Sequence, residues 1–399
     1  ELKKQNFGQD IPFLLSMTPS ALTTSDAGAG IGYTTLRVRG TDGTRINITA
    51  NGIPMNDAES HTLFWVNMPD FASSVKDIQV QRGAGTSTNG AGAFGASVNM
   101  QTEGISMQPY AEINASYGSF NAHKETVKFG TGLLKDHWAF DARLSNIGTD
   151  GYIDRASVDL YSFYAQGGYF ADNTSVKFIT FGGKEKTYHA WNYATKEEMK
   201  KYGRRFNSCG MYTDDDGHIR FYKDQTDNYL QINNQLVLSH RFNEKWTLNA
   251  TGFYTYGYGY YKQYKDARTL SEYLNIPTDV AAGKEADLIR EKIMRNHLGG
   301  LNASAAYSVR KLDLAFGGSY SYYSCPHWGV LDWVDGLEGS QIGGRWYDND
   351  VDKHDANLFA RASWTVARGL RLFGDLQYRY VSYQAWGVND NFISEEVGM

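Results

Sequence analysis

The stretch WTLNATGFYTYGY, residues Trp246–Tyr258, alternates between two faces along its length. One face carries Trp, Leu, Ala, Gly and Tyr, and the other carries mainly Thr and Asn. The stretch LRLFGDLQYRYVSY, residues Leu370–Tyr383, repeats this pattern, with Leu and Tyr opposite Arg, Asp and Gln. A transmembrane β-strand needs about 9–11 residues to cross a tilted bilayer. Both stretches are long enough, and they predict membrane-spanning strands with one lipid-facing and one lumen-facing side.

The connections between strands carry equal information. The alternation recurs at 138–146, 312–323 and 358–366, and we expect about eleven strands after Pro109. Short turns and long loops on opposite sides are typical of an outer-membrane barrel, whereas a soluble sandwich has no reason to sort its loops. We therefore predict a mainly β fold, a transmembrane antiparallel β-barrel. The short turns are expected at 135–136, 171–173, 243–245, 309–311 and 368–369, and the long loops at 149–156, 184–226, 260–296 and 325–355.

Eleven strands leave an open edge, and an unpaired edge in lipid costs several kcal/mol per backbone group. Single-chain bacterial barrels usually have an even number of strands. We therefore expect the chain to be part of a longer barrel and to end, at Met399, in an outer loop. Glu1 opens without an initiator methionine or the apolar segment of a signal peptide, so we expect residues upstream as well.

Composition excludes several function classes. The 399 residues carry a formal net charge of −5, so no basic face for nucleic acid is expected. No run of about 18 apolar residues could form a transmembrane helix. The 9 histidines show no catalytic-triad or HExxH pattern, and we expect no enzyme activity. The glycine-rich stretch at 83–92 lacks the GK[ST] sequence of a phosphate-binding loop.

The first hundred residues follow a different pattern. Glycine is dense from Gly28 to Gly104, and short strands are expected at 36–40, 45–55 and 77–83, with a loop over 58–71. We predict a small mixed α/β domain at residues 1–105, followed by the barrel at residues 106–399.

This N-terminal stretch resembles the plug of a TonB-dependent outer-membrane receptor. The resemblance lies in IGYTTLRVRGTDGTRINITANGIPMND, residues 31–57, and VKDIQVQRGAGTSTNGAGAFGASVNMQT, residues 75–102. The family's "DGIP" turn is Asn51-Gly52-Ile53-Pro54 here, and the family's Glu before an Arg-Gly pair is Gln79. The resemblance implies a 22-stranded barrel, of which about half is present, in the outer membrane of a Gram-negative bacterium.

The resemblance also implies a function. Such receptors capture a scarce nutrient complex and import it with energy from the partner TonB, which pulls a box expected upstream of Glu1. A ferric siderophore is the family's commonest cargo, and cobalamin or an oligosaccharide are alternatives. Outer-membrane lipid and a surface lipoprotein are further expected partners. A passive porin or an adhesin is the alternative from another class.

Candidate binding residues follow from this reading. One group of candidates lies at the plug apex, in the loop after Pro54 and in a second apical turn. The other group consists of aromatic residues in the outer loops. The alternative for His61 is an ordinary surface histidine. The alternative for the aromatic residues is the girdle of the barrel at the membrane interface, to which we assign the tyrosines of 256–264. Three plug arginines would be costly in the lumen unless paired, and we expect salt bridges from them to the barrel wall. The apex candidates are Asn56, Asp57, Glu59, Ser60, His61, Phe64, Thr88 and Asn89, the loop candidates are His189, Trp191 and Tyr193, and the arginines are Arg37, Arg39 and Arg82.

Metal and disulfide chemistry remain open at this stage. Acidic clusters at 214–217 and 348–355 could bind calcium in outer loops, although neither matches the EF-hand pattern, and a solvated acidic turn is the alternative. Cys209 and Cys325 are too few for a tetrahedral site of their own. Both are expected in outer loops, where a disulfide between them is a hypothesis. We expect no other cofactor.

Overall fold

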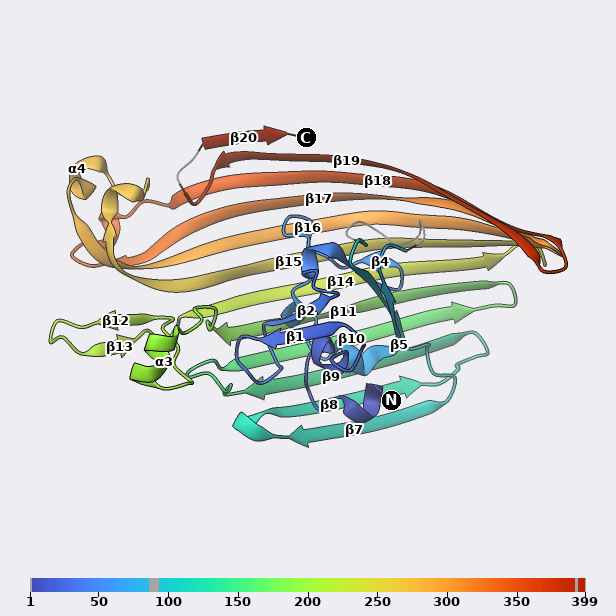
Figure 1. Ribbon diagram of the computed structural model, residues 1–399, viewed down its shortest axis with the longest axis horizontal. Helices are drawn as coiled ribbons and strands as arrows, with labels where there is room; N and C mark the ends of the chain where they lie inside the picture. The colour runs from blue at the N-terminus through green and yellow to red at the C-terminus, as the bar shows by residue number, and fades with distance from the viewer. Residues whose placement is uncertain (1, 86–92, 392–393, 399) are drawn as a thin grey trace.

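The computed structural model describes residues 2–85, 93–391 and 394–398. A single twelve-stranded antiparallel sheet dominates it, with neighbouring strands in chain order except that β12 and β13 stand apart (Figure 1). The strands are β7 (Pro109–Tyr117), β8 (His123–Thr131), β9 (Trp138–Thr149), β10 (Val158–Phe170), β11 (Thr174–Tyr188), β14 (Thr226–Arg241), β15 (Trp246–Thr269), β16 (Glu285–Val309), β17 (Leu312–Val334), β18 (Arg345–Ala367), β19 (Leu370–Val388) and β20 (Ser394–Gly398).

The sheet confirms the predicted barrel strands and adds one. Eleven of its strands end by β19, and the twelfth, β20, pairs antiparallel with β19 where an outer loop was expected. The predicted alternation holds in β19, because the strand runs without a break from Leu370 to Val388 and therefore turns Leu370, Leu372, Leu376 and Tyr378 to one face. Within the described residues no helix is long and apolar enough to span a membrane.

Short and long connections fall on opposite ends of the sheet, as predicted. Two-residue turns at 310–311 and 368–369 lie at one end, and the loop over 189–225 lies at the other (Figure 1). The long connections contain α3 (Lys196–Tyr202), β12 (Met211–Thr213), β13 (Ile219–Phe221), η5 (Leu270–Glu272), α4 (Thr278–Ala281) and η6 (Gly339–Gln341), and η4 (Ser119–Asn121) joins β7 to β8.

Two predicted loops are wrong over much of their length. Residues 260–269 and 285–296 extend β15 and β16, and residues 325–334 and 345–355 extend β17 and β18. The extensions are rich in charge, which suggested loop, but the charges pair across strands: Lys262 of β15 contacts Glu291 of β16 at 3.0 Å. Cross-strand ion pairs of this kind stabilise a sheet without apolar alternation.

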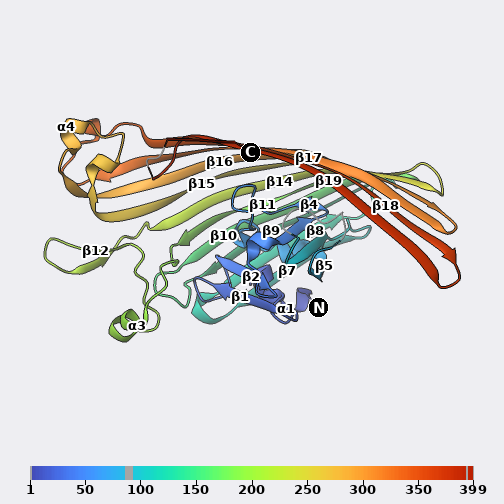
Figure 2. The same cartoon turned by 45° about the horizontal axis from the view of Figure 1, so that its top comes forward.

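The plug lies against the concave face of the curved sheet (Figure 2). Its central sheet has the order β4-β3-β6-β5, with β3 and β6 parallel, and β1 pairs with β2 in a separate hairpin-like pair. The plug elements are α1 (Leu2–Gln5), α2 (Ile11–Leu14), β1 (Ala21–Ser25), β2 (Thr34–Val38), η1 (Gly43–Arg45), β3 (Ile46–Ala50), β4 (Ile53–Pro54), η2 (Trp65–Asn67), η3 (Phe71–Ser74), β5 (Val75–Arg82) and β6 (Ala96–Thr102).

The strand expected over residues 45–55 is in fact a tight hairpin. Asn51 and Gly52 both adopt positive φ, 55° and 80°, which is the geometry that favours Asn-Gly in two-residue turns. The turn folds β4 back on β3. It therefore sends the chain after Pro54 toward the long-loop end of the sheet.

Plug and wall share one hydrophobic core. Val38, Ile46 and Val98 of the plug are fully buried or nearly so in the same cluster as Phe181 of β11. The ring of Phe71 lies 4.7 Å from that of Phe181, centroid to centroid. Apolar burial thus fixes the plug on β10 and β11, and the polar contacts described next fix its orientation.

Candidate functional site

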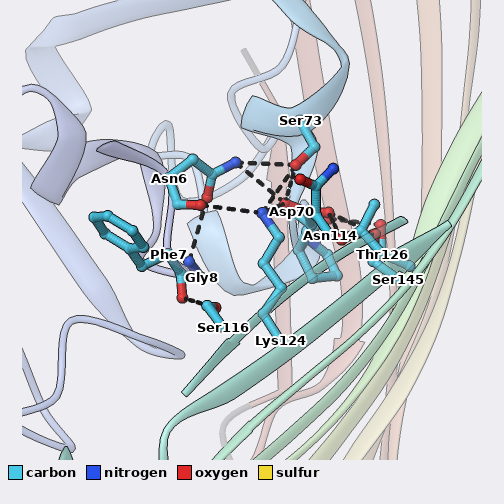
Figure 3. Close-up of polar contacts among 12 residues, drawn as sticks. Asn6, Phe7, Gly8, Asp70, Ser73, Asn114, Ser116, Lys124, Thr126 and Ser145 are labelled. Carbon is cyan, nitrogen blue, oxygen red and sulfur yellow. Dashed lines mark hydrogen bonds and ion pairs between the residues drawn. The ribbon is translucent and has the colours of Figure 1, made fainter. Parts of the chain in front are cut away.

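A buried charge network ties the plug to strands β8 and β9 (Figure 3). Asp70, in a left-handed conformation before η3, contacts Nζ of Lys124 at 2.8 Å and Nη1 of Arg143 at 2.7 Å. Burial alone would raise the pKa of Asp70, but Arg143 and Lys124 hold it well below its usual range. Asn6 and Thr126 add hydrogen bonds to the same carboxylate. One carboxylate thus joins three separate segments.

Among the described residues, the predicted plug arginines form no ion pair with the wall. Arg37, Arg39 and Arg82 are exposed, and no ion pair joins them to the described barrel residues. The charges run in the opposite sense, with acids on the plug and bases on the wall: besides Asp70, Glu103 of the plug lies 3.5 Å from Lys128 of β8. The assignment of the wall salt bridges to these arginines is therefore not supported by the described contacts.

The loop after Pro54, residues 55–64, is called the apex loop here, and side-chain hydrogen bonds hold it in place. The Asn56 side chain accepts a hydrogen bond from the Ile48 amide at 2.8 Å and donates to the carbonyl oxygens of Ile46 and His61. Asp57 caps the following turn by accepting from the amides of Glu59 and Ser60. These hydrogen bonds hold the apex loop in one conformation.

A cavity of about 750 Å³ lies between this loop and the inner face of the wall. Volumes of this size suit a small-molecule ligand. Five predicted apex residues and one predicted loop residue line it together: Asn56, Asp57, Glu59, Ser60, Phe64 and Trp191.

The other predicted residues lie elsewhere. His61 is exposed beside the cavity and is not among its lining residues, and Tyr193 is exposed and donates a hydrogen bond to Asp26 at 3.0 Å. Thr88 and Asn89 lie outside the described residues.

His189 supports the lining from behind. Its ring stacks on Trp191 with centroids 3.8 Å apart, and Tyr261 closes the other side of both rings edge-on. The imidazole is 2% exposed, and burial lowers the pKa of His189 to about 3. His189 is therefore neutral at physiological pH and positions the Trp191 indole, which faces the cavity.

Part of the lining is acidic. Glu185 of β11 and Asp227 of β14 meet Tyr33 of the plug, whose hydroxyl donates to Asp227. Burial raises the pKa of Tyr33 well above its usual value, and the two carboxylates add to the effect. The phenol therefore stays protonated and acts as a donor at the junction of plug and wall.

Sequence reasoning missed most of the wall residues. They lie inside long strands, where a polar residue at an inward position looks like any other lumen residue. The inward alternation of Tyr229, Gln231 and Asn233 in β14 was the available signal. Tyr260 and Tyr261, within the segment assigned to the aromatic girdle, also line the cavity.

The acidic clusters differ from each other. Residues 348–355 form part of β18 and not a loop, so successive side chains point to opposite faces, and Asp348, Asp352 and Asp355 each have separate partners. Residues 214–217 do form a turn between β12 and β13, where Asp214 pairs with Arg220 at 2.7 Å. Calcium binding at that turn stays a prediction.

The proposed disulfide is wrong. Cys209 and Cys325 are both buried free thiols, and Cys325 lies in β17 and not in a loop. The two thiols therefore lie in different elements and are not joined to each other.

Comparison with known proteins identifies the N-terminal domain. Residues 1–97 match the family described as TonB-dependent Receptor Plug Domain. The N-terminal domain is thus a plug domain of the TonB-dependent receptor type.

Solved structures show the same fold across the whole chain. The ferric citrate transporter FecA in its unliganded form superposes with a TM-score of 0.74 at 12% identity, covering 99% of this chain and 57% of FecA. FpvA from Pseudomonas aeruginosa PAO1 bound to pyoverdine gives 0.69 at 13%, covering 98% and 56%. The ferric-catecholate import receptor Fiu from Escherichia coli K12, closed form, gives 0.70 at 12%, covering 100% and 59%.

The chain thus spans between half and three-fifths of the length of these structures. No curated protein matches it in sequence. At these identities the superpositions show a shared fold, and the chemistry of the cavity has to be argued from its own residues.

Proposed function

We propose that the receptor imports a scarce nutrient complex across the outer membrane, with energy from the partner TonB. The observation that carries this proposal is the composite cavity. Residues 54–60 of the plug and residues of β11, β14, β15, β16 and β17 line the same space. A cargo that fills it contacts both bodies at once, so displacement of the plug removes part of the binding site. Energy applied to the plug is then coupled to cargo release.

A ferric siderophore is the proposed cargo. The lining is aromatic, with Tyr33, Phe64, Trp191 and Tyr260 among its rings, and aromatic faces suit catecholate or similar flat groups. The matched structures include FpvA bound to pyoverdine and the ferric citrate transporter FecA. That likeness supports the cargo class without identifying the compound.

The charged residues that line the cavity restrict which ferric complexes it can bind. Its carboxylates are Asp57, Glu59, Glu185, Asp227 and Asp390, against the ammonium of Lys292, which is itself paired with Asp390. The described lining therefore offers no unpaired lysine or arginine to bind a strongly anionic complex. We therefore expect a ferric complex that is neutral or cationic on the face that enters the cavity.

An oligosaccharide is a second candidate because of the same lining. Carboxylates and the amides of Asn56, Asn67 and Gln231 offer hydrogen bonds to hydroxyl groups beside stacking rings. Cobalamin is a third cargo of the class. A passive porin or adhesin accounts less well for a plug that shares a buried core and a charge network with the wall.

Uptake in iron-limited cells tests the proposal. Cells that rely on this receptor are given ⁵⁵Fe-labelled siderophores of different net charge, labelled cobalamin, or labelled oligosaccharides, with and without TonB. We expect accumulation of one cargo that stops without TonB while surface binding persists. Accumulation that is unchanged without TonB would contradict energised transport and favour a passive channel.

A further inference from the structure

A cluster of three metal-ligand side chains joins the apex loop to the wall. Cys325 and His327 are two residues apart in β17, so the strand's period of two places both on its inner face. Glu59 approaches them from the plug. Oε1 of Glu59 lies 3.4 Å from Nε2 of His327, and Sγ of Cys325 lies 3.5 Å from the same nitrogen. All three ligand atoms lie within 4.8 Å of one another.

These separations fit the edges of a tetrahedron around a metal ion. Zinc binds thiolate sulfur at about 2.3 Å and imidazole nitrogen or carboxylate oxygen at about 2.0 Å. At tetrahedral angles these bond lengths separate sulfur from nitrogen by about 3.5 Å, and nitrogen from oxygen by about 3.3 Å. Both distances agree with these values, and the third pair, Sγ of Cys325 and the Glu59 carboxylate oxygen, lies within 4.8 Å.

The surroundings also suit a metal site. The Tyr323 hydroxyl donates to Oε1 of Glu59 at 2.7 Å and orients that carboxylate, as outer-shell groups do in metal centres. Cys325 is fully buried, whereas Glu59 and His327 line the cavity. Three protein ligands thus leave a fourth position that can open toward the cavity.

We propose that Glu59, Cys325 and His327 form a binding site for a divalent transition metal of the zinc type. Sulfur, nitrogen and oxygen ligands in this combination select zinc-like ions over calcium or magnesium. Binding requires the Cys325 thiolate, so the thiol proton leaves to solvent. The bound ion links the plug apex directly to β17, and it latches the apex loop against the wall.

The second cluster with suitable ligands is a weaker candidate. Asp214, Asp216 and His218 also approach one another, but they lie in an exposed turn, and Arg220 already pairs with Asp214. Nothing else at that turn points to an ion, so the proposal rests on the buried cluster alone.

Cobalt binding tests the site directly, because Co²⁺ replaces zinc and reports thiolate ligation by its charge-transfer absorption. The intact receptor, extracted from outer membranes and stripped with chelator, is titrated with Co²⁺ and then with Zn²⁺. We expect one equivalent of Co²⁺ with a thiolate band that Zn²⁺ removes. The absence of such a band in the wild-type receptor would overturn the proposal.

Matched variants locate the ligands. C325S is expected to abolish the band, and H327Q and E59Q to weaken Co²⁺ affinity at least about tenfold. C209S is the control, since Cys209 is equally buried but lies in the loop between β11 and β14. A band that survives C325S, or that C209S removes, would overturn the assignment. Heat-modified gel mobility verifies that each variant is folded.

The latch has a separate readout. Zn²⁺ is expected to protect the segment 55–64 from hydrogen exchange in the wild-type and C209S receptors, and not in H327Q. Equal protection in H327Q would contradict a link through β17. These measurements need no cargo, so their failure is distinguishable from failure of the proposed transport function.

Discussion

Asp70 of the plug and Arg143 of β9 form an ion pair of 2.7 Å in which the side chains are 0% and 2% exposed. Lys124 of β8 contacts the same carboxylate. This buried acid between two buried bases joins the plug to two strands of the wall. It lies away from the cavity, so one part of the plug is anchored while the apex loop carries the site.

Replacing Asp70 with Asn is expected to destabilise the plug by about 3–5 kcal/mol, because two buried cations lose their counter-ion. The control is Asp77→Asn, an exposed carboxylate of β5. Denaturant unfolding followed by plug tryptophan fluorescence measures the difference. Equal stability of the two variants would show that the pair does not hold the plug.

The same pair predicts a pH response. Because the folded-state pKa of Asp70 is depressed, its contribution is present above the unfolded-state pKa and is lost only as pH falls through the depressed value. The anchor is therefore expected to persist throughout the neutral and mildly acidic range. A loss of the anchor between pH 7 and 5 would contradict this.

Asp10 predicts the opposite response. Its carboxyl is buried beside α2, accepts a hydrogen bond from Thr34 at 2.8 Å, and has a pKa raised by burial to about 7. Between pH 4 and 7 the unfolded chain loses this proton while the folded chain keeps it. Plug stability is therefore expected to fall as pH rises through that window and to level off above it.

Asp10→Asn should flatten this slope, since the amide keeps the acceptor and cannot ionise. Hydrogen exchange of residues 6–15 at pH 5 and pH 8 measures the effect, with Asp77→Asn as the control. An unchanged slope in Asp10→Asn would assign the pH response to another group, such as Glu185 of β11, which interacts electrostatically with Asp10.

The outer face of the barrel predicts a depth-dependent charge cost. Leu376 lies six residues into β19 after the short turn and is 77% exposed on the apolar face. Leu376→Arg is expected to destabilise the barrel by about 2–4 kcal/mol, because arginine then faces lipid near mid-membrane. Gln377→Arg, on the opposite face, is the matched control and should be nearly neutral. Unfolding of the receptor in lipid vesicles compares them, and equal costs would refute the assignment of faces.

The stacking of His189 on Trp191 predicts that His189 affects cargo affinity through packing and not through charge. His189→Phe keeps a flat ring against Trp191 and should leave cargo affinity nearly unchanged, whereas His189→Ala should weaken it about 2–10-fold. Since burial keeps His189 neutral above about pH 3, its titration should produce no step in cargo binding between pH 5 and 8. Equilibrium titration of both variants with the transported cargo tests this. A step lost in His189→Phe would show that the imidazole is charged when cargo binds.

The barrel could be predicted from the sequence because contact with lipid on one face makes apolar and polar residues alternate along each strand. Leu370, Leu372 and Leu376 are expected on one face, and the unbroken strand β19 places them there. The strand extensions could not be predicted in the same way. Beyond the bilayer both faces of a strand can be polar. The sequence around Lys262 and Glu291 therefore indicates a loop, although the two residues form an ion pair across β15 and β16.

The candidate site was predictable only on the plug side. The Asn51-Gly52 turn fixes where the chain after Pro54 must go, and the apex loop follows from it. The wall contributes residues far apart in sequence, such as Glu185 and His327, and only the strand register brings them to one cavity. No local pattern could have joined Glu59 to Cys325.

Cargo binding to cavity variants tests the central claim most directly. The intact receptor is titrated with its transported cargo, and Trp191→Ala is compared with Trp138→Ala, whose ring lies exposed on β9 away from the cavity. We predict that Trp191→Ala weakens binding at least about tenfold, as expected for an aromatic anchor, and that Trp138→Ala has no effect. Equal affinity of Trp191→Ala and the wild-type receptor would place the cargo outside this cavity and contradict the account.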